Sequence, residues 1–493
     1  MSQIKKLAGQ TAYYGISSIL GRVLNFLLLP IWTDRLDEAE YGSVSYLYTY
    51  IAIMLIIYTF GMETAFFRFS RKESAKDAFN NAGTAVLLVS TLLSGFIFFT
   101  APNIAGLLGE GIAPQYIQYM AIILFIDAIV AIPFAKLRLE EKALKFALVK
   151  SGVITVTILL NLLFIIVFPD ILAGKYLSSL EGFVESFYKP AYGVGYIFMV
   201  NLIANALYLP FLWPEFRSLK LKIHWPTFKP MFLYAFPIFL MGLGGIFNEQ
   251  GYNIIMEAIL GKAELGVFAS AVKLSVIMML GIQAFRYAVE PFFFNHSENR
   301  EAPALFARIM HYFVVFNIFV MVAVALNMNL LSDLFLQQEE YKGALYVLPL
   351  LLLAKLFYGI YVNLSVWFKI KDKTIYGTYY ALAGTVITLI GNILLIPILG
   401  FYGSTITSLL CYIVMCSLCY FKGKKEFPVP YKLKPLIIYL LLGLAIIYGE
   451  GLIEIANRWL SYGFDLLVTA IFAVFMYFRE GKSLTYKTIS NKS

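Results

Sequence analysis

The chain carries little charge. Only 14% of its 493 residues are Asp, Glu, Lys or Arg, against about a quarter in a typical soluble domain. Hydrophobic residues make up 60% of the sequence and the mean hydropathy is +0.76, so the apolar surface exceeds what soluble cores can bury. A soluble enzyme with a sizeable catalytic domain is therefore excluded, and lipid is the solvent that this composition fits.

Cysteine and histidine are also scarce. The three cysteines, Cys411, Cys416 and Cys419, lie in one apolar segment, and the three histidines are dispersed. A disulfide framework needs cysteines that can pair between segments, and a structural zinc site usually needs four nitrogen or sulfur ligands. We therefore expect no disulfide, no metal site and no cofactor, and we interpret the cysteines as small apolar helix residues.

Long apolar runs, in contrast, are abundant. A membrane-spanning helix needs about 20 consecutive apolar residues, and fourteen such runs lie near 10–33, 43–66, 79–101, 115–137, 146–168, 193–213, 231–256, 264–289, 304–331, 343–368, 375–398, 401–421, 435–452 and 459–478. The first run is too long for a signal peptide and contains Arg22, so we expect it to remain as the first helix. The predicted fold class is all-α, a polytopic membrane protein of about 14 transmembrane helices.

The distribution of Lys and Arg predicts the topology. Of the 39 basic residues, 29 lie at the termini and in the connectors on the same side, whereas the opposite connectors hold six. Because short basic loops stay in the cytoplasm, we expect both termini to be cytoplasmic and the number of spans to be even. The net charge of +9 thus encodes orientation, and nucleic acid is excluded as a partner.

Four basic residues remain inside apolar spans: Arg22, Lys273, Arg286 and Lys355. A charge at mid-membrane costs about 2.5–3.5 kcal/mol unless it faces water or a partner. These residues therefore mark either a water-filled cavity or buried ion pairs, and for Arg22 we favour the cavity.

Three carboxylates are candidate partners for these bases: Asp127, Glu249 and Glu290. Glu290 lies four residues after Arg286, so an ion pair along one helix is an alternative for that arginine. The same carboxylates are candidates for ion coupling or gating, because an intramembrane carboxylate can carry a proton or a sodium ion.

An internal repeat indicates two similar halves. At a shift of 224 residues, Glu-Tyr-Gly at 40–42 matches Glu-Leu-Gly at 264–266. At a shift of 231 residues, four positions match by residue type: Arg138, Lys142, Thr157 and Asn161 correspond to Lys369, Lys373, Thr388 and Asn392. Two like-oriented six-helix lobes are typical of transporters that bind substrate between bundles. We expect an N-lobe over 1–213 (helices 1–6), a cytoplasmic linker over 214–230, a C-lobe over 231–421 (helices 7–12), and two C-terminal helices with a cytoplasmic tail over 422–493.

Several stretches carry a family resemblance: GRVLNFLLLPIWTDRL (21–36), EYGSVSY (40–46), GMETAFFRF (61–69), IQAFRYAVEPFFF (282–294), LSVWFKIKDKTIYG (364–377) and NILLIPILGFYGS (392–404). They resemble the bacterial polysaccharide-repeat-unit flippases for O-antigen and exopolysaccharide, in the multidrug/oligosaccharidyl-lipid/polysaccharide exporter superfamily. The resemblance implies a two-lobed flippase of the bacterial cytoplasmic (inner) membrane, serving polysaccharide biosynthesis such as that of lipopolysaccharide. Its substrate would be an undecaprenyl-diphosphate-linked glycan, turned from the cytoplasmic to the periplasmic leaflet by alternating access. Membrane lipid and polysaccharide assembly proteins are the other partners that it implies.

The resemblance also bears on single residues. Arg22 and Arg286 match basic residues that such flippases place on helices one and eight, lining the cavity. Similar sequences often carry an Asp-Arg pair on helix seven after an Asn-Glu, whereas this chain has Asn248-Glu249 followed by Tyr252-Asn253. Because the Asp-Arg pair is missing here, Glu249 becomes the favoured candidate on this helix for gating or ion coupling.

A diphosphate head group needs fixed cations in a low-dielectric cleft, which Arg22, Lys273, Arg286 and Lys355 could supply. Sugar rings favour aromatic faces and amide donors. The candidate sugar-binding residues within the spans are Asn25, Asn161, Gln283, Tyr361, Asn363 and Trp367.

Two other functions are compatible with a polytopic chain. A cation-coupled multidrug antiporter would favour a cavity dominated by carboxylates, whereas bases predominate here. A membrane polysaccharide polymerase would need acid/base residues at a water-accessible face, and the longest outer connector, about 169–192, contains neither His nor Arg. We therefore expect a transporter and no enzymatic activity.

Overall fold

The computed structural model describes residues 23, 26–70, 75–296, 301–453 and 455–490, without the side chains of 287–288, 290–291, 294–296 and 481–490. Arg22, Asn25 and the side chain of Glu290 therefore lie outside the described residues.

Within the described residues all regular structure is helical, as predicted. In the part of the chain that the structure describes, twelve helices are long and apolar enough to cross a membrane, and they coincide with twelve of the fourteen predicted spans. The predicted sixth span is a shorter apolar helix, Gly195–Phe211, and most of the first span lies outside the described residues. The prediction of a polytopic all-α membrane protein is confirmed.

The N-terminal half (residues up to 213) consists of α2 (Leu29–Arg35), α3 (Glu38–Thr59), α4 (Met62–Phe69), α5 (Ala75–Phe99), α6 (Ala101–Leu107), α7 (Pro114–Leu139), α8 (Ala143–Leu162), η1 (Leu163–Val167), α9 (Phe168–Leu172), η2 (Ser178–Leu180), α10 (Glu181–Glu185), η3 (Pro190–Tyr192), α11 (Gly195–Ala206), α12 (Tyr208–Phe211) and the start of α13 (Trp213–Arg217). A capping box starts α3, because Asp37 accepts from the Glu40 amide while the Glu40 side chain accepts from the Asp37 amide.

The C-terminal half (residues from 231) contains most of α14 (Trp225–Gln250), then α15 (Tyr252–Leu260), α16 (Lys262–His296), α17 (Ala302–Leu326), α18 (Met328–Phe335), η4 (Glu339–Val347), α19 (Leu348–Leu364), α20 (Val366–Ile370), α21 (Ile375–Leu399) and α22 (Phe401–Glu426). Two further helices follow, α23 (Leu433–Glu450) and α24 (Arg458–Ser490). Both pack against α17.

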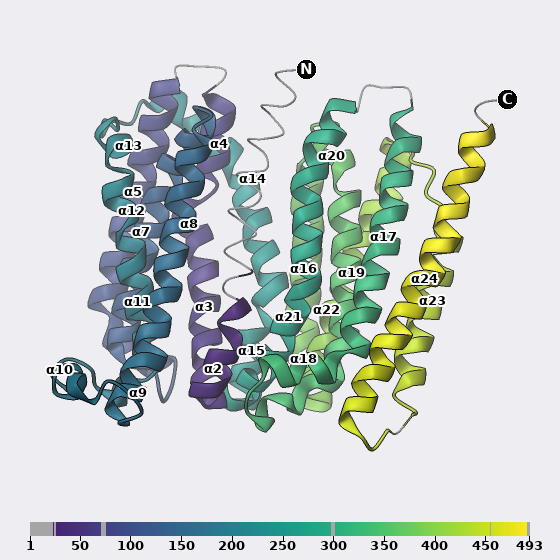
Figure 1. Ribbon diagram of the computed structural model, residues 1–493. Coiled ribbons are helices and arrows are strands. Elements are labelled where there is room, and N and C mark those ends of the chain that lie inside the picture. Colours follow the sequence, from purple (N-terminus) through teal and green to yellow (C-terminus); the bar gives the residue numbers. More distant parts are fainter. Residues whose placement is uncertain (1–22, 24–25, 71–74, 297–300, 454, 491–493) are drawn as a thin grey trace.

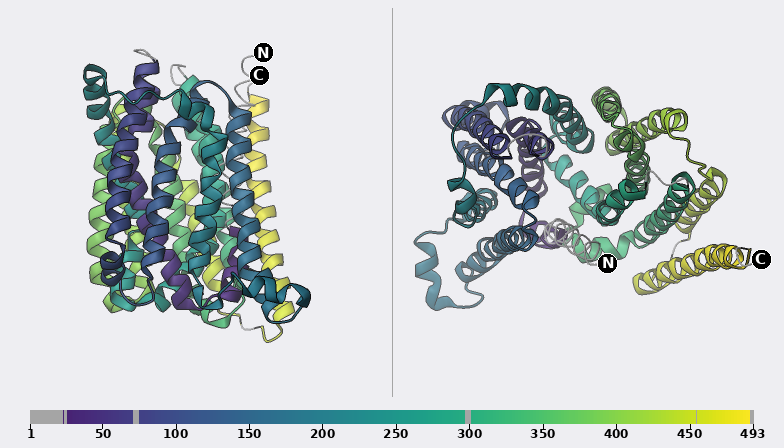
Figure 2. Two further views of the ribbon diagram at one scale, coloured as in Figure 1. Left: turned by 90° about the vertical axis from the view of Figure 1, so that its left-hand side faces the viewer. Right: turned by 90° about the horizontal axis from the view of Figure 1, so that it is seen from above.

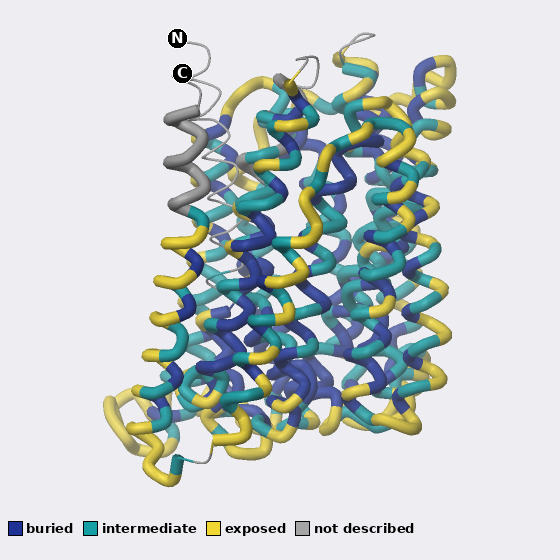
Figure 3. The backbone as a smooth tube through the Cα atoms, turned by 90° about the vertical axis from the view of Figure 1, so that its right-hand side faces the viewer, coloured by how far each residue is buried: buried dark blue, intermediate teal, exposed yellow. Residues whose placement is uncertain are grey.

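The helices run side by side, with the N-terminal half on one side, α14 and α16 in the middle, and α23 and α24 on the other side (Figures 1 and 2). The connectors rich in Lys and Arg, such as 369–373 and 422–434, lie at the upper end in Figure 1, which we call the basic end. The other is the far end, where a short arm over 173–192 extends away from the bundle. Exposed residues follow the flanks and buried ones fill the interior (Figure 3), and the exposed set includes many large apolar side chains, as expected for lipid contact.

Matched local geometry accompanies the sequence repeat. Glu141 and Asp372, which lie 231 positions apart, both have positive φ angles, of 57° and 54°. The following amide closes the same turn in each case: Lys142 N donates to Leu137 O over 2.9 Å, and Lys373 N donates to Phe368 O over 2.8 Å. This is the hydrogen-bond pattern of a Schellman cap after the helix of each half.

Candidate functional site

The two halves approach each other most closely where α3 crosses α16 at the far end. A Cβ atom on Gly42 would lie 2.7 Å from the carbonyl carbon of Lys262, and one on Gly266 would lie 2.9 Å from that of Glu38. Real Cβ contacts are essentially never closer than 3.0 Å. Only glycine fits at both positions, so the backbones of the two halves touch directly. We call Gly42 and Gly266 the glycine crossing.

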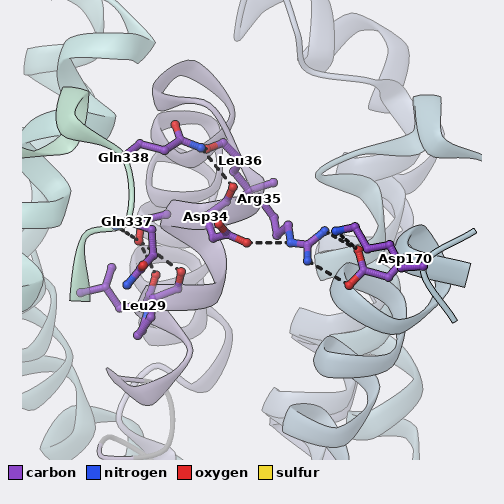
Figure 4. Close-up of polar contacts among 10 residues, drawn as sticks. Leu29, Asp34, Arg35, Leu36, Asp170, Gln337 and Gln338 are labelled. Atoms are coloured by element: carbon purple, nitrogen blue, oxygen red, sulfur yellow. Dashed lines mark hydrogen bonds and ion pairs between the residues drawn. The ribbon is translucent and has the colours of Figure 1, made fainter. Parts of the chain in front are cut away.

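Hydrogen bonds join the halves beside the glycine crossing (Figure 4). The Thr33 hydroxyl on α2 lies 3.0 Å from the main-chain oxygen of Phe335 and accepts from the Gln337 amide over 3.2 Å. The Gln338 side chain donates to the Asp34 carbonyl over 3.1 Å, and the Tyr341 hydroxyl lies 2.8 Å from the Asp37 carbonyl. Residues 33–37 are thus bound to the segment that runs from the end of α18 into η4.

Helix α2 is fixed to its own half by a charged pair. The Arg35 guanidinium donates to both carboxylate oxygens of Asp170 on α9, over 3.0 and 3.1 Å, and Lys175 donates to the same carboxylate over 2.9 Å. The Asp170 side chain is only 9% exposed. This forked geometry holds α2 rigidly between the two halves (Figure 4).

Lys273 lies near this junction. Its Nζ is 5.8 Å from the centre of the Trp32 ring on α2, a cation–π contact between the halves. Trp32 is buried, and its Nε1 has no hydrogen-bond partner among the described residues. Two other candidates, Gln283 and Arg286, lie further along α16 toward the basic end. Gln283 is 4% exposed, and its Oε1 likewise has no partner in the described part of the chain.

Lys355 has a different environment. It is 8% exposed on α19 and lies close enough to Glu249 on α14 for the two charges to attract each other. Cys411 on α22 also faces it. Lys355 and Glu249 are thus brought together inside the C-terminal half, whereas Lys273 contacts the other half. This placement favours the ion-pair interpretation for Lys355.

Asp127 lies within the N-terminal half. Its Oδ1 accepts from the Asn205 amide on α11 over 2.9 Å, and its charge interacts with Lys150 on α8. It also faces the half-buried Tyr48. Asn205 is not among the candidate residues that the sequence marks, although an Asn inside an apolar run is a signal that could mark it.

Three of the candidate sugar-binding residues lie near the basic end, on α19 and α20. Asn363 and Trp367 line a cavity of about 20 Å³, which is room for a single water molecule. The Trp367 indole donates to the Cys419 sulfur over 3.3 Å, while Asn363 Nδ2 has no partner among the described residues. Tyr361 lies beside Cys416 and Cys419. In this conformation the cavity is too small for a sugar ring.

Asn161 lies deep in the N-terminal half and has a matching residue in the other half. The Asn161 side chain donates to the Thr157 carbonyl over 2.8 Å, and Asn392 donates to the Thr388 carbonyl over 2.7 Å. In both residues Oδ1 is enclosed without a partner within the described residues. The Asn161 amide is therefore used inside its own helix, and only its oxygen is available.

No group of three or more His, Cys, Asp or Glu side chains that could hold a metal ion occurs within the residues that the structure describes.

The fold is shared with known transporters. The structure of the lipid II flippase MurJ in an inward closed conformation superposes with a TM-score of 0.70 at 17% identity, covering 94% of this chain and 98% of that chain. An inward-facing multidrug resistance MATE family transporter of the MOP superfamily matches with a TM-score of 0.60 at 16% identity, covering 89% and 98%. The chain is thus a multi-pass membrane protein with the fold of this superfamily of transporters.

The sequence comparisons identify the family. The profile of the polysaccharide biosynthesis protein family matches residues 7–296, more than half of the chain. The chain belongs to this family. A protein of the Lsg locus of Haemophilus influenzae is 20% identical over 417 residues, spanning 81% of this chain and 95% of that protein.

Proposed function

We propose that this protein is a flippase that turns an undecaprenyl-diphosphate-linked oligosaccharide from the cytoplasmic to the periplasmic leaflet of the bacterial inner membrane. No bond is made or broken in this step. The observation that carries the proposal is the presence of two cations, Lys273 and Arg286, on α16 of a polysaccharide biosynthesis protein, because α16 is the membrane-spanning helix that crosses α3 of the other half. A diphosphate cannot cross hydrocarbon without such neutralisation.

The halves act in this proposal as an N-lobe (1–213) and a C-lobe (231–421), with 214–230 as the linker and 422–493 as the added C-terminal helices and tail. The matched turns at Glu141 and Asp372 support the division. The basic end faces the cytoplasm, because basic connectors remain there. The far end then faces the periplasm, and the glycine crossing closes the pathway on that side.

The head group enters from the cytoplasm in this proposal. Arg286 and then Lys273 lie along α16 toward the closed end, and together with Arg22 they bind the diphosphate, while the lipid tail stays in the bilayer. Opening of the glycine crossing, with closure at the basic end, then exposes the head group to the periplasm. Such rocking of two lobes around a fixed site is alternating access.

Energy coupling is assigned to intramembrane carboxylates in this proposal. Glu249 faces Lys355 in the C-lobe, and Asp127 faces Lys150 in the N-lobe. Protonation or sodium binding at either carboxylate would release its lysine and change the balance of charge in that lobe. If transport in vesicles ignored both pH and sodium gradients, the coupling role of Asp127, Glu249 and Glu290 would be refuted.

The test of the function is deletion of the gene, followed by mass spectrometry of lipid-linked oligosaccharides. We expect one such oligosaccharide to accumulate on the cytoplasmic side and surface polysaccharide to be lost. Arg22→Ala at normal protein level should reproduce the loss of surface polysaccharide, and undiminished export would refute the role of Arg22. If no oligosaccharide accumulated and sensitivity to cationic dyes rose, the protein would be a multidrug antiporter.

A further inference from the structure

Two carboxyl groups face each other where the added C-terminal helices meet the C-terminal half, at the far end. Glu450 is the last residue of α23, and Asp465 lies two turns into α24. Their carboxyl groups lie close enough to interact directly with each other. Asp465 is only 1% exposed, and both its oxygens are enclosed without an N–H or O–H donor from any described residue.

A third oxygen group comes from Asn327, which follows the last residue of α17. Its Nδ2 donates to the Thr469 hydroxyl over 3.0 Å. Thr469 is one turn beyond Asp465 on the same face of α24, and its hydroxyl lies 2.7 Å from the main-chain oxygen of Asp465. The Asn327 amide therefore contacts the face of α24 that also carries Asp465. Asn327 is 8% exposed, and its Oδ1 is buried with no partner among the described residues.

The basic side chains nearest in sequence are engaged elsewhere. Arg458 pairs with Asp333 and contacts Tyr462, while Lys342 pairs with Asp333 and Glu339. No basic side chain in the described part of the chain acts appreciably on Glu450 or Asp465. Two carboxylates in contact, one of them fully buried, cannot both be ionised unless a cation lies between them.

We propose that Glu450, Asp465 and Asn327 Oδ1 bind a divalent cation that prefers oxygen ligands. Two carboxylates neutralise one divalent charge, and every available ligand atom is oxygen. The ligands come from α23, from α24 and from the residue that follows α17, so their arrangement has no regular geometry. This suits the flexible coordination of Ca²⁺ better than the strict octahedron of Mg²⁺. The ion would fasten α23 and α24 to the end of α17, and partly exposed Glu450 provides its entry route.

The test is equilibrium binding of radioactive Ca²⁺ to the purified full chain after treatment with EDTA, together with thermal unfolding. We expect one Ca²⁺ per chain and a Tm that rises with Ca²⁺, less with Mg²⁺ and not with K⁺. Asp465→Asn and Asn327→Ala should each weaken binding at least about tenfold, as expected for loss of one ligand. Glu185→Gln, at an exposed acid on the arm, is the matched control and should bind Ca²⁺ normally.

A shared proton is the alternative that this experiment separates. If the wild-type chain bound no Ca²⁺, and Asp465→Asn at neutral pH unfolded at the same or a higher temperature, the pair would hold a proton and the cation site would be refuted. Asn327→Ala keeps both acids and so remains informative if Asp465→Asn fails to fold. Unchanged Ca²⁺ binding by Asn327→Ala would overturn the site as assigned.

Discussion

Substitution of Gly42 by alanine should open the far end of the protein. The added methyl carbon would lie 2.7 Å from the Lys262 carbonyl carbon, whereas ordinary contact begins at 3.4 Å. The opposing atoms are backbone, so α3 and α16 must separate by about 0.7 Å or more. Overpacking of this kind costs about 1–3 kcal/mol. Because the cost falls only on the closed arrangement, the equilibrium between closed and open states should shift by roughly 5–150-fold.

The assay is a distance measurement by pulsed electron paramagnetic resonance between spin labels on cysteines at positions 110 and 339. Glu110 and Glu339 are exposed at the far end on opposite halves, and the three natural cysteines are buried, so labelling is selective. We expect Gly42→Ala to add a longer-distance population that the wild-type chain lacks.

The matched control is Gly106→Ala, because a Cβ on Gly106 in α6 meets nothing within 4 Å. It should leave the distance distribution unchanged. If folded Gly42→Ala gave the same distribution as the wild type, the glycine crossing would not be the gate.

Three other predictions concern charged side chains. Arg35→Ala should lower the free energy of unfolding by about 1–3 kcal/mol, because Asp170 is 9% exposed and would keep only Lys175; thermal unfolding equal to the wild type would contradict this. Burial alone would raise the pKa of Asp333, but its hydrogen bonds and charge interactions with Lys342 and Arg458 hold it below the usual value. The stability advantage of the wild type over Asp333→Asn should therefore be full above about pH 4 and disappear as the pH falls through the lowered pKa; an advantage that stayed constant down to low pH would argue against it. Lys273→Met should reduce surface polysaccharide at normal protein level, with Lys273→Arg retaining more activity because it keeps the charge over Trp32; equal loss in both variants would indicate a packing role.

The spans could be predicted from the sequence because each needs only about 20 apolar residues in a row, a property that is local. The predicted sixth span, 193–213, differs from the other described spans in length, because it forms the shorter helix Gly195–Phe211. The short helices of the arm, α10 among them, depend on packing of aromatic side chains such as Phe168 and Phe187, whose rings lie 5.2 Å apart. Such contacts leave no periodic signal in the sequence.

The site was harder to predict, because its partners come from distant parts of the chain. The repeat aligned Gly42 with Gly266, but only the fold shows that these two glycines meet. The sequence leaves a cavity and buried ion pairs open for the four intramembrane bases, and only the fold shows that Lys355 faces Glu249 within one half while Lys273 faces Trp32 across the two halves. Charge counts identify which residues are costly in a membrane, and the three-dimensional arrangement decides what compensates each of them.

The most direct test of lipid flipping uses vesicles that contain the purified protein and an undecaprenyl-diphosphate-linked oligosaccharide in both leaflets. A membrane-impermeant glycosidase added outside attacks only sugars in the outer leaflet. Together with the gradient that drives transport, the protein should make the oligosaccharide of both leaflets accessible, whereas protein-free vesicles should protect the inner-leaflet pool. If vesicles with folded protein protected that pool as fully as empty ones under every imposed gradient, the flippase function would be contradicted.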